Sequence, residues 1–268
     1  MGIAYGNKKE YDKAIVAYQK AVEINSKYDM AYNNMGVAYV DKKEYDKAIE
    51  AYQKAVEINP KDDDAYYNMG NVYGNKKEYD KAIEAYQKAV EINPKKYKAY
   101  SNMGIVYGNK KEYDKAIVAY QKAVEIKPKD DRIYYNMGSA YYSLGEFDNC
   151  IKSLSLALKI NPNNSSAYTN LFELQLTQNQ PFDQELEAKY IELFQNQKES
   201  FIHYEMLKIF QAIASGKDAN VESWKQKYEG VGLGGWSFDE LLEWIDGFDE
   251  GEVKVELQKA LGVFEEHR

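Results

Sequence analysis

The chain has 268 residues and a formal net charge of −8, with 44% hydrophobic and 29% charged residues. These proportions are typical of a globular protein, and the acidic balance argues against a nucleic-acid scaffold, which would show a basic face. No apolar run approaches the roughly 18 residues that a membrane-spanning helix needs, and no signal peptide opens the sequence. We therefore expect a cytoplasmic protein, or a cytoplasmic piece of a longer one, that binds neither nucleic acid nor membranes.

One segment recurs along the N-terminal part of the chain. The sequence of Lys42–Pro60, KKEYDKAIEAYQKAVEINP, returns almost unchanged at Lys76–Pro94 and Lys110–Pro128, an earlier copy starts at Lys8, and a looser copy ends at Pro162. The copies start at 8, 42, 76 and 110, which is a constant step of 34 residues. Such a period predicts an array of repeated helical units that stack on one another, rather than a single globular core.

The residues that recur within each period resemble the tetratricopeptide repeat (TPR). In the third copy, the matching residues are Met69, Gly70, Tyr73, Ala82, Tyr86, Ala89 and Pro94. The pattern returns in five copies over residues 1–178, with Ser26 in place of the closing proline in the first copy and Cys150 in place of an alanine in the fifth. The resemblance implies an all-α fold, a right-handed α-solenoid of stacked helix pairs, and a role in binding peptides or partner proteins.

In chain order, the sequence begins at the Met of a Met-Gly pair, inside the first helix of a repeat, and we interpret the chain as a fragment of a longer protein. The next helix is predicted from Glu10 to Asn25, with an apolar stripe along one face. Each unit of a repeat array buries a face on its neighbour, so an end without a cap leaves an apolar patch that tends to self-associate. The residues expected to form this self-association surface are Ile3, Ala14, Ile15, Tyr18 and Val22.

Each following repeat is expected to form two antiparallel helices. The first helices are predicted at Ala31–Val40, Ala65–Tyr73, Ala99–Tyr107 and Ile133–Tyr142. The second helix is predicted at Tyr45–Asn59 and at the equivalent positions of later repeats, and it ends before a proline because proline cannot continue a helix. In the turn between the two helices, Lys43, Lys77 and Lys111 stand where the family has glycine. A left-handed residue is costly without glycine, so these turns are expected to be slightly strained or to use another geometry.

The match to the repeat fades after Asn163. We divide the chain into a TPR array at 1–162, the first helix of a degenerate sixth repeat at 163–178, and a helical extension at 179–268 that covers the last repeat. Phe172 replaces the glycine of the sixth repeat, so close helix packing is not expected there. Within the extension, helices are predicted at Pro181–Gln197, Glu199–Ala214, Val221–Tyr228, Phe238–Ile245 and Val253–Glu266.

An asparagine precedes each Met-Gly pair, and by alignment one more follows in the sixth repeat. These residues are Asn34, Asn68, Asn102, Asn136 and Asn170. The resemblance implies that first helices line the concave groove of the array, where each carboxamide could donate to a peptide carbonyl and accept from a peptide amide. This pattern is similar to the asparagine ladder of the O-linked GlcNAc transferase superhelix. Two alternatives are that the asparagines recur because the copies are recent duplications, or that they support helix packing.

The positions around the ladder vary between repeats and are predicted to contact ligand side chains. They include Asn33, Tyr67, Asn71, Lys98, Arg132 and Tyr135. Co-chaperones of this family clamp a terminal carboxylate with a basic residue and an asparagine on successive repeats, and Lys98 with Asn102 and Arg132 with Asn136 provide half of that set. The alternative for the two cations is simple solvation.

No cofactor, metal or catalytic site is predicted. His203 and His267 are the only histidines, and neither has a cysteine, serine or second histidine at a useful spacing. The single cysteine, Cys150, is expected to be buried and inert. The sequence therefore predicts a non-enzymatic scaffold that binds an extended peptide or partner protein in a concave groove, with structural self-assembly through the first repeat, giving a homo-oligomer, as the alternative.

Overall fold

The computed structural model describes residues 2, 6, 9–217, 219–229, 231, 238–249 and 251–266. These residues form helices and turns and no strand, which confirms the all-α prediction. The chain divides into two compact units, unit 1 at Met1–Glu146 and unit 2 at Phe147–Arg268. None of the described helices is long and apolar enough to cross a membrane.

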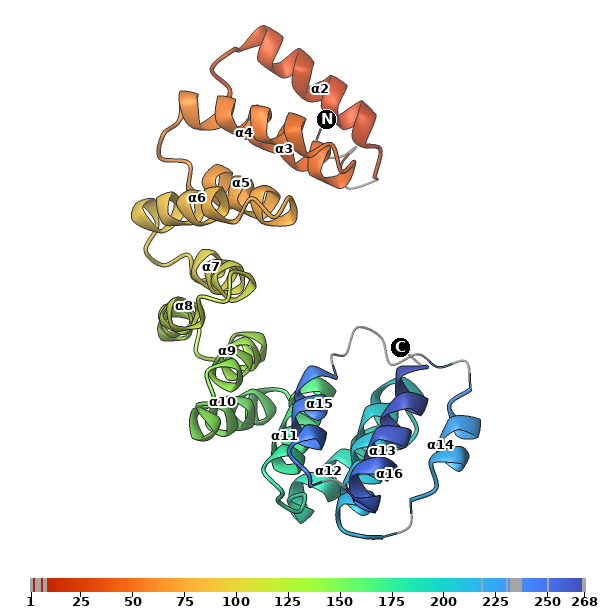
Figure 1. The fold of residues 1–268 in the computed structure, drawn as a ribbon. Coiled ribbons are helices and arrows are strands. Elements are labelled where there is room, and N and C mark those ends of the chain that lie inside the picture. The colour runs from red at the N-terminus through yellow and green to blue at the C-terminus, as the bar shows by residue number, and fades with distance from the viewer. Residues whose placement is uncertain are drawn as a thin grey trace. The chain divides into compact units, whose positions relative to one another are not determined.

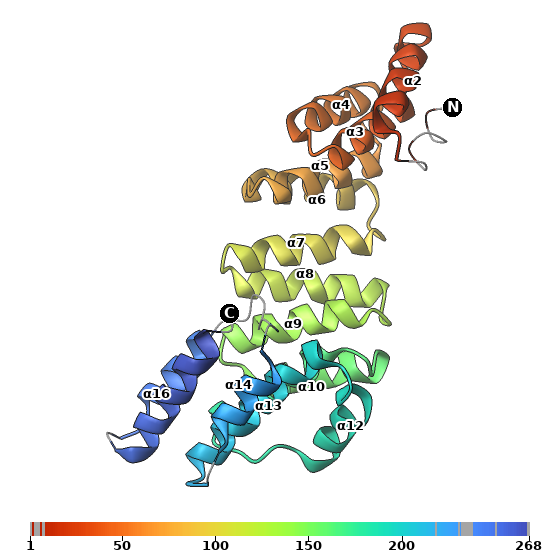
Figure 2. The ribbon, with the colours of Figure 1, turned by 90° about the vertical axis from the view of Figure 1, so that its right-hand side faces the viewer.

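Unit 1 is a stack of helix pairs, as the repeat pattern predicts (Figures 1 and 2). Its helices are α2 (Tyr11–Ile24), α3 (Asp29–Asp41), α4 (Tyr45–Ile58), α5 (Asp63–Asn75), α6 (Tyr79–Ile92), α7 (Tyr97–Asn109), α8 (Tyr113–Ile126) and α9 (Asp131–Ser143). The first helices α3, α5 and α7 pack on the second helices α4, α6 and α8, and each second helix packs on the first helix of the next repeat. The first helices begin two residues before the predicted positions. At α5 the reason is a cap, because the Asp62 side chain accepts a hydrogen bond from the Ala65 amide at 3.0 Å.

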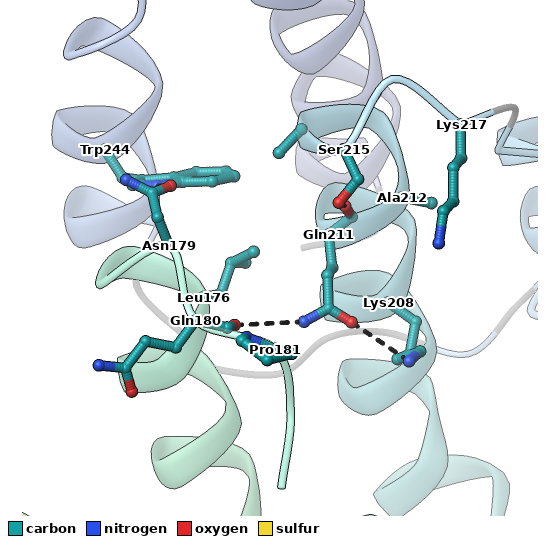
Figure 3. Close-up of a pocket in the computed structure, with 11 residues that line it drawn as sticks. Leu176, Asn179, Gln180, Pro181, Lys208, Gln211, Ala212, Ser215, Lys217 and Trp244 are labelled. Carbon is teal, nitrogen blue, oxygen red and sulfur yellow. Dashed lines mark hydrogen bonds between the residues drawn. The ribbon is translucent and has the colours of Figure 1, made fainter. Parts of the chain in front are cut away.

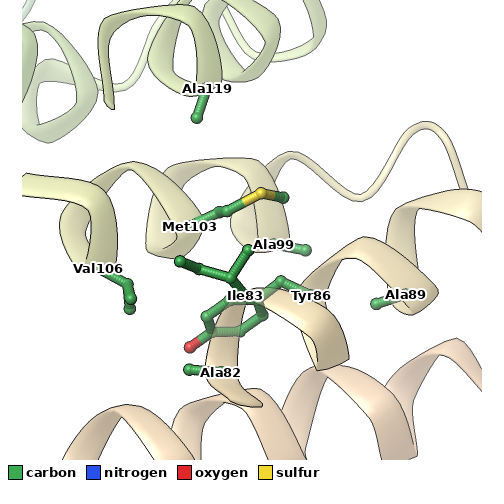
Figure 4. Close-up of a cluster of buried hydrophobic side chains, with 8 residues drawn as sticks. All are labelled: Ala82, Ile83, Tyr86, Ala89, Ala99, Met103, Val106 and Ala119. Carbon is green, nitrogen blue, oxygen red and sulfur yellow. The ribbon is translucent and has the colours of Figure 1, made fainter. Parts of the chain in front are cut away.

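The core between repeats uses small residues and one tyrosine per second helix. In the cluster around α6 and α7, Tyr86 and Ile83 of α6 lie beside Met103 and Val106 of α7 (Figure 4). The Tyr86 ring also covers Gly70 so closely that a Cβ atom on Gly70 would lie 2.6 Å from the ring. The Met-Gly pair is therefore required by helix packing, because only glycine lets the tyrosine ring reach the first helix.

The turn between the two helices of a repeat is left-handed even though it has lysine instead of glycine. Lys43, Lys77 and Lys111 have φ angles of 61°, 60° and 60°, and Gly145 occupies the same position with a φ of 72°. At Lys77 the backbone amide donates to the Gly74 carbonyl at 2.9 Å, and the next amide donates to the Tyr73 carbonyl at 2.9 Å. This is the Schellman arrangement, in which glycine usually occupies the left-handed position. Of the two expectations, slightly strained turns or another turn geometry, the observed φ angles therefore support the first.

Two sets of polar contacts, which the sequence pattern did not predict, join neighbouring repeats. The Asn93 amide donates to Asp63 Oδ2 at 2.8 Å, and this bond fastens the loop before α7 to the start of α5. Lys76 forms ion pairs with Asp46 of the preceding repeat at 2.7 Å and with Glu78 at 2.8 Å. Equivalent contacts occur one repeat away in each case. The residues of the repeated segment that face away from the core therefore hold successive helix pairs together.

Unit 2 is also helical. It consists of α10 (Phe147–Ile160), α11 (Ser165–Thr177), α12 (Gln184–Phe194), α13 (Lys198–Ala214), α14 (Val221–Lys227), α15 (Asp239–Asp246) and α16 (Glu252–Glu265). Helix α11 packs on α10 and, on its other sides, on α13 and α15, and α16 packs on α13. The extension thus covers α11, the helix that the sequence interprets as the start of a sixth repeat.

The helix pairing changes at Phe172 of α11, where the earlier repeats have glycine. Phe172 is fully buried and stacks on Phe182 with ring centroids 4.9 Å apart, while Tyr190 meets it edge-on at 5.6 Å. Aromatic packing of this kind replaces the close glycine–tyrosine approach. Cys150 in α10 is buried as predicted, and burial raises the pKa of its thiol to about 11.

Candidate functional site

The candidate site is the side of unit 1 on which consecutive first helices meet, here called the inner face. Helix α3 contacts α5, α5 contacts α7 and α7 contacts α9, whereas the second helices α4, α6 and α8 make fewer contacts with one another. The first helices therefore lie on the shorter side of the stack. The ladder asparagines lie on this same side, because their side chains reach from one first helix to the next.

Two ladder asparagines are hydrogen-bonded to the preceding repeat. The Asn68 amide nitrogen donates to Asn33 Oδ1 at 3.2 Å, and the Asn102 amide nitrogen donates to Asn71 Oδ1 at 2.8 Å. It also lies 3.3 Å from the Tyr67 hydroxyl oxygen. These bonds orient both carboxamides, and neither carbonyl oxygen receives a hydrogen bond from another described residue. An acceptor on each of the two asparagines is thus available to a ligand.

Asn71 joins the ladder to the core. Its carbonyl oxygen accepts from Asn102 and also from the hydroxyl of Tyr86 at 2.8 Å. Tyr86 is almost fully buried, and this burial raises the pKa of its hydroxyl, which therefore remains a neutral donor. The rings of Tyr67 and Tyr86 lie 6.0 Å apart. Three predicted contact residues, Tyr67, Asn71 and Asn102, thus form one connected group between α5 and α7.

Lys96 belongs to this region but was not among the predicted site residues. Its ammonium pairs with Asp63 at 2.7 Å and with Asp64 at 2.5 Å, and it lies 5.4 Å from the centroid of the Tyr67 ring. Burial lowers the pKa of Lys96, but the hydrogen bonds to the two carboxylates outweigh burial, and the pKa is raised. The signal for this cluster in the sequence is the acidic run at the start of α5 together with the basic loop one repeat later.

The two cations of the predicted carboxylate clamp differ. Arg132 forms two hydrogen bonds of 3.1 Å to Asp130, with its side chain 78% exposed, so its charge is already balanced by a neighbour. A ligand carboxylate would therefore compete with Asp130 for Arg132, and the carboxylate clamp stays a prediction. Lys98 is exposed and forms no ion pair with a described residue. Of the two predicted cations, Lys98, at the first turn of α7, is therefore the one without an ion pair to a described residue.

The other predicted contact residues are half-buried. These are Asn33, Asn34, Tyr135, Asn136 and, in unit 2, Asn170. Asn34 and Asn136 make no side-chain hydrogen bond to a described residue, unlike the two asparagines between them. Val37 and Ile105, each three residues after a ladder asparagine, are 42% and 41% exposed. The inner face therefore combines amides, tyrosines and a few accessible apolar side chains.

The predicted self-association surface is largely inside the first repeats. Ala14 and Ile15 are buried against Met35 and Ala38 of α3, because α2 packs on α3 as other second helices do. They therefore do not form an exposed apolar patch, contrary to expectation. Tyr18 and Val22 are half-buried at the edge of the same cluster, and a Cβ on Gly2 would clash with the Tyr18 ring. The last residue of the set, Ile3, lies outside the described residues.

Comparisons with known families agree with the repeat pattern. Models described as "TPR repeat" match residues 2–42, 38–77 and 109–145. Models described as "Tetratricopeptide repeat" match residues 63–96 and 132–164, and residues 85–118. Together the matches span residues 2–164, which is more than half of the chain. A comparison with curated proteins gave no match.

Solved structures with the same fold include three informative neighbours. A crystal structure of MamA is 32% identical, covers 62% of this chain and 97% of that chain, and has a TM-score of 0.58. YrrB, described as "a TPR protein with an unusual peptide-binding site", is 22% identical over 69% of this chain and 96% of that chain, with a TM-score of 0.58. The pilF protein of Pseudomonas aeruginosa is 19% identical over 77% and 93%, with a TM-score of 0.65. These neighbours confirm the solenoid fold, whereas the likeness to the asparagine ladder of the O-linked GlcNAc transferase stays a prediction.

Proposed function

Since the chain belongs to the tetratricopeptide-repeat family, we propose that it is a protein–protein interaction scaffold whose inner face binds an extended segment of a partner polypeptide. The proposal assigns no catalytic step and no cofactor to the chain. Binding requires only that the inner face match the hydrogen-bonding groups of a peptide backbone and offer contacts for some of its side chains.

The observation that supports this proposal best is the orientation of Asn68 and Asn102. Each carboxamide is held by a hydrogen bond to the preceding repeat, and each keeps its carbonyl oxygen open. A side chain that is already fixed loses little conformational freedom when a ligand binds, so its hydrogen bonds contribute more of their energy to affinity. The backbone N–H groups of an extended peptide are suitable donors for these oxygens.

Asn34 and Asn136 complete the series within unit 1. Their amides are half-buried and without a side-chain partner among the described residues, so both the donor and the acceptor of each are available. We assign the backbone contacts to these four asparagines of unit 1, and Asn170 of unit 2 stays a prediction of the repeat pattern. YrrB, a TPR protein of the same fold with a peptide-binding site, supports peptide binding as a function of such an array.

Ligand side chains would meet the variable positions between the amides. Val37 and Ile105 present accessible apolar groups, Tyr67 and Tyr135 present rings with a polar end, and Lys98 presents an open positive charge. Tyrosine gives a large contact area at a low entropic cost, which suits a binding surface. The expected ligand therefore carries apolar side chains, with an acidic residue near α7.

The test begins with peptides selected from a displayed random library on the intact chain, because the natural ligand is unidentified. The affinity of a selected peptide is then measured for Asn34→Ala/Asn136→Ala, which removes amides that have no side-chain hydrogen bond to a described residue. Each lost bond should weaken binding by about 1 kcal/mol, while the circular dichroism spectrum stays unchanged. The matched control is Gln53→Ala/Gln87→Ala, which removes exposed carboxamides from the second helices α4 and α6.

The companion variant is Asn68→Ala/Asn102→Ala. It should weaken peptide binding and also lower the urea midpoint slightly, because it removes hydrogen bonds between repeats. If the first double variant binds the peptide as tightly as the original chain, and the second changes only the urea midpoint, the asparagines are structural and the proposal is wrong.

The alternative function is self-association through α2. The observation in its favour is Ile24, which is 88% exposed, whereas Ile58, Ile92 and Ile126 at the equivalent positions are partly buried. Light scattering over a range of concentrations tests it, with Ile24→Asp as the variant. An apparent mass that rises with concentration in the original chain but not in Ile24→Asp would favour self-association. A constant monomeric mass for both chains would exclude it.

A further inference from the structure

Unit 2 contains a cavity of about 470 Å³ between the end of α11 with its following turn, the C-terminal half of α13, and α15 (Figure 3). Several of its polar side chains are engaged in the walls: the Trp244 indole donates to Asn179 Oδ1 at 3.1 Å, and the Gln211 amide donates to the Gln180 carbonyl at 3.4 Å. The Lys217 ammonium and the Asn179 amide lie on opposite sides of the cavity (Figure 3). Because the polar groups do not converge on one point, the cavity indicates no particular ligand, and the stronger signal lies on the inner face of unit 1.

One position of each first helix on the inner face lies three residues after the ladder asparagine. In α5 this residue is Asn71, whose side-chain oxygen accepts from Asn102 of α7 at 2.8 Å, so the position faces the next first helix. By the repeat, the same position is Val37 in α3, Ile105 in α7 and Ser139 in α9. It varies although the intervening second helices α4, α6 and α8 differ from one another at one position only. Apolar and polar residues therefore alternate from repeat to repeat along the inner face.

The two polar side chains at this position are used inside the array, whereas the two apolar side chains are accessible. Asn71 also accepts from the hydroxyl of Tyr86 at 2.8 Å, and the Ser139 hydroxyl donates to a backbone carbonyl of its own helix at 3.2 Å. Val37 and Ile105 are both exposed. Covering a branched aliphatic side chain is favourable in proportion to the apolar area that leaves water. Val37 and Ile105 are therefore the positions at which the inner face gains most from apolar ligand side chains.

The distance between these two positions sets the spacing of the ligand side chains that reach them. Helix α3 contacts α5, and α5 contacts α7. Packed helices lie about 8–10 Å apart, so the two steps from α3 to α7 span about 16–20 Å. An extended peptide rises about 3.3 Å per residue, and its side chains alternate between opposite faces. A peptide that crosses the first helices therefore places residues i and i+6 on one face about 20 Å apart, whereas residue i+5 points away and residue i+4 reaches only about 13 Å.

We propose that the inner face selects extended polypeptide segments that carry two apolar side chains, here called anchors, six residues apart. One anchor binds at Val37 and the other at Ile105. This inference rests on the proposed function, because the ladder asparagines hold the ligand backbone between the two anchors. The ligand residues between the anchors cross α5, where Tyr67 and Asn71 present polar groups, so no apolar residue is required there. A helical ligand is a different outcome, since a helix rises about 1.5 Å per residue and needs about 13 residues to span 20 Å.

The test uses a peptide selected from a displayed random library on the intact chain. Library members of about 16 residues are long enough to cover both positions in an extended or a helical form. An alanine scan of the selected peptide, followed by fluorescence anisotropy, should show two apolar residues six apart that each weaken binding about tenfold when replaced. Inserting one residue between them turns the second anchor to the opposite face and should weaken binding by a similar factor. Anchors in a helical pattern of i, i+3, i+4 and i+7 would overturn the proposal.

Two variants of the chain locate the anchors. Val37→Ser and Ile105→Ser introduce the residue that the fifth repeat already has at this position, and each should weaken the peptide about tenfold. Each variant should also make the alanine replacement of one anchor silent, a different anchor for each variant, which pairs every anchor with its site. The matched control is Val118→Ser, which removes an exposed valine from the second helix α8 and should change nothing.

The results separate the anchors from the proposed function. If the asparagine variants weaken the peptide but Val37→Ser and Ile105→Ser bind it as tightly as the original chain, the inner face binds the peptide backbone and the assignment of the anchors is wrong. If neither the asparagine variants nor the serine variants change the affinity, the proposed function and the anchors are both wrong. Failure of the intact chain to select any peptide from the library would also overturn both.

Discussion

The left-handed lysines of the repeat turns allow a quantitative test of how the sequence stabilises the fold. Lys77 has a φ of 60°, where an L-residue places its Cβ too close to the following carbonyl. Its side chain is exposed and makes no hydrogen bond or ion pair with a described residue, so replacing it removes no contact. Lys77→Gly therefore isolates the backbone contribution at this turn.

The magnitude follows from two opposing effects. A non-glycine residue in the left-handed region costs about 1–2 kcal/mol. Glycine loses more freedom on folding, and this costs about 0.5–1 kcal/mol. The net change should stabilise the chain by about 0.5–1 kcal/mol per turn, and Gly145, which already occupies the same turn position with a φ of 72°, shows that glycine fits the geometry.

Urea denaturation followed by circular dichroism measures this change, with Lys43→Gly and Lys111→Gly as independent repeats of the experiment. Because the three turns are far apart, their effects should add. Two controls separate the causes: Lys77→Ala keeps the left-handed strain and should give no gain, and Lys88→Gly, in the middle of α6, should destabilise by about 1 kcal/mol. An equal gain from Lys77→Ala would refute the backbone explanation.

Three further predictions concern packing, acidity and the cysteine. Gly70→Ala should destabilise by about 1–3 kcal/mol in urea, because the new Cβ meets the Tyr86 ring, whereas Gly108→Ala, whose Cβ meets nothing within 4 Å, should not. Hydrogen bonds from Lys76 and then Lys81 lower the pKa of Glu78 from its ordinary value of 4.5. Because the pKa of Glu78 is lower in the folded chain than in the unfolded chain, its ionised carboxylate stabilises the fold at pH values above 4.5. The urea midpoint should therefore fall as the pH drops below 4.5, and the fall should be less steep in Lys76→Gln. Cys150, with a pKa raised to about 11, should react with a thiol reagent only after unfolding.

The sequence predicted unit 1 well because each structural requirement recurs at a fixed step. Proline after Ile-Asn ended the second helices within one residue of the observed ends, and the glycine of each Met-Gly pair indicated close helix packing, which the structure shows to be against a tyrosine ring. The helix starts were less accurate, since the Asp62 cap lets α5 begin at Asp63, two residues before the apolar pattern begins at Ala65. A cap depends on one side chain, whereas the periodic signal is summed over several turns.

Unit 2 was harder to predict because its contacts are not repeated. The bounds of α12–α16 follow from local signals, but which helix covers α11 depends on aromatic contacts such as Phe172 with Phe182. Phe172 departs from the glycine of the repeat pattern, Phe182 lies outside the repeats, and ring pairs of this kind have no sequence pattern of their own. The cavity beside Trp244 depends on the same helix arrangement, so no sequence signal could have identified it.

The ladder illustrates where prediction from repeats stops. The step of 34 residues makes the asparagines equivalent in sequence, yet Asn102 is held by Asn71, whereas the position that corresponds to Asn71 in the repeat before Asn136 is occupied by Ile105, which has no side-chain acceptor. A side chain's partner is supplied by the neighbouring repeat, where the residues vary. Identical asparagines therefore differ in how firmly they are oriented, and because a fixed donor or acceptor binds with less entropic loss, the amides between α5 and α7 should contribute most to the register of a bound peptide.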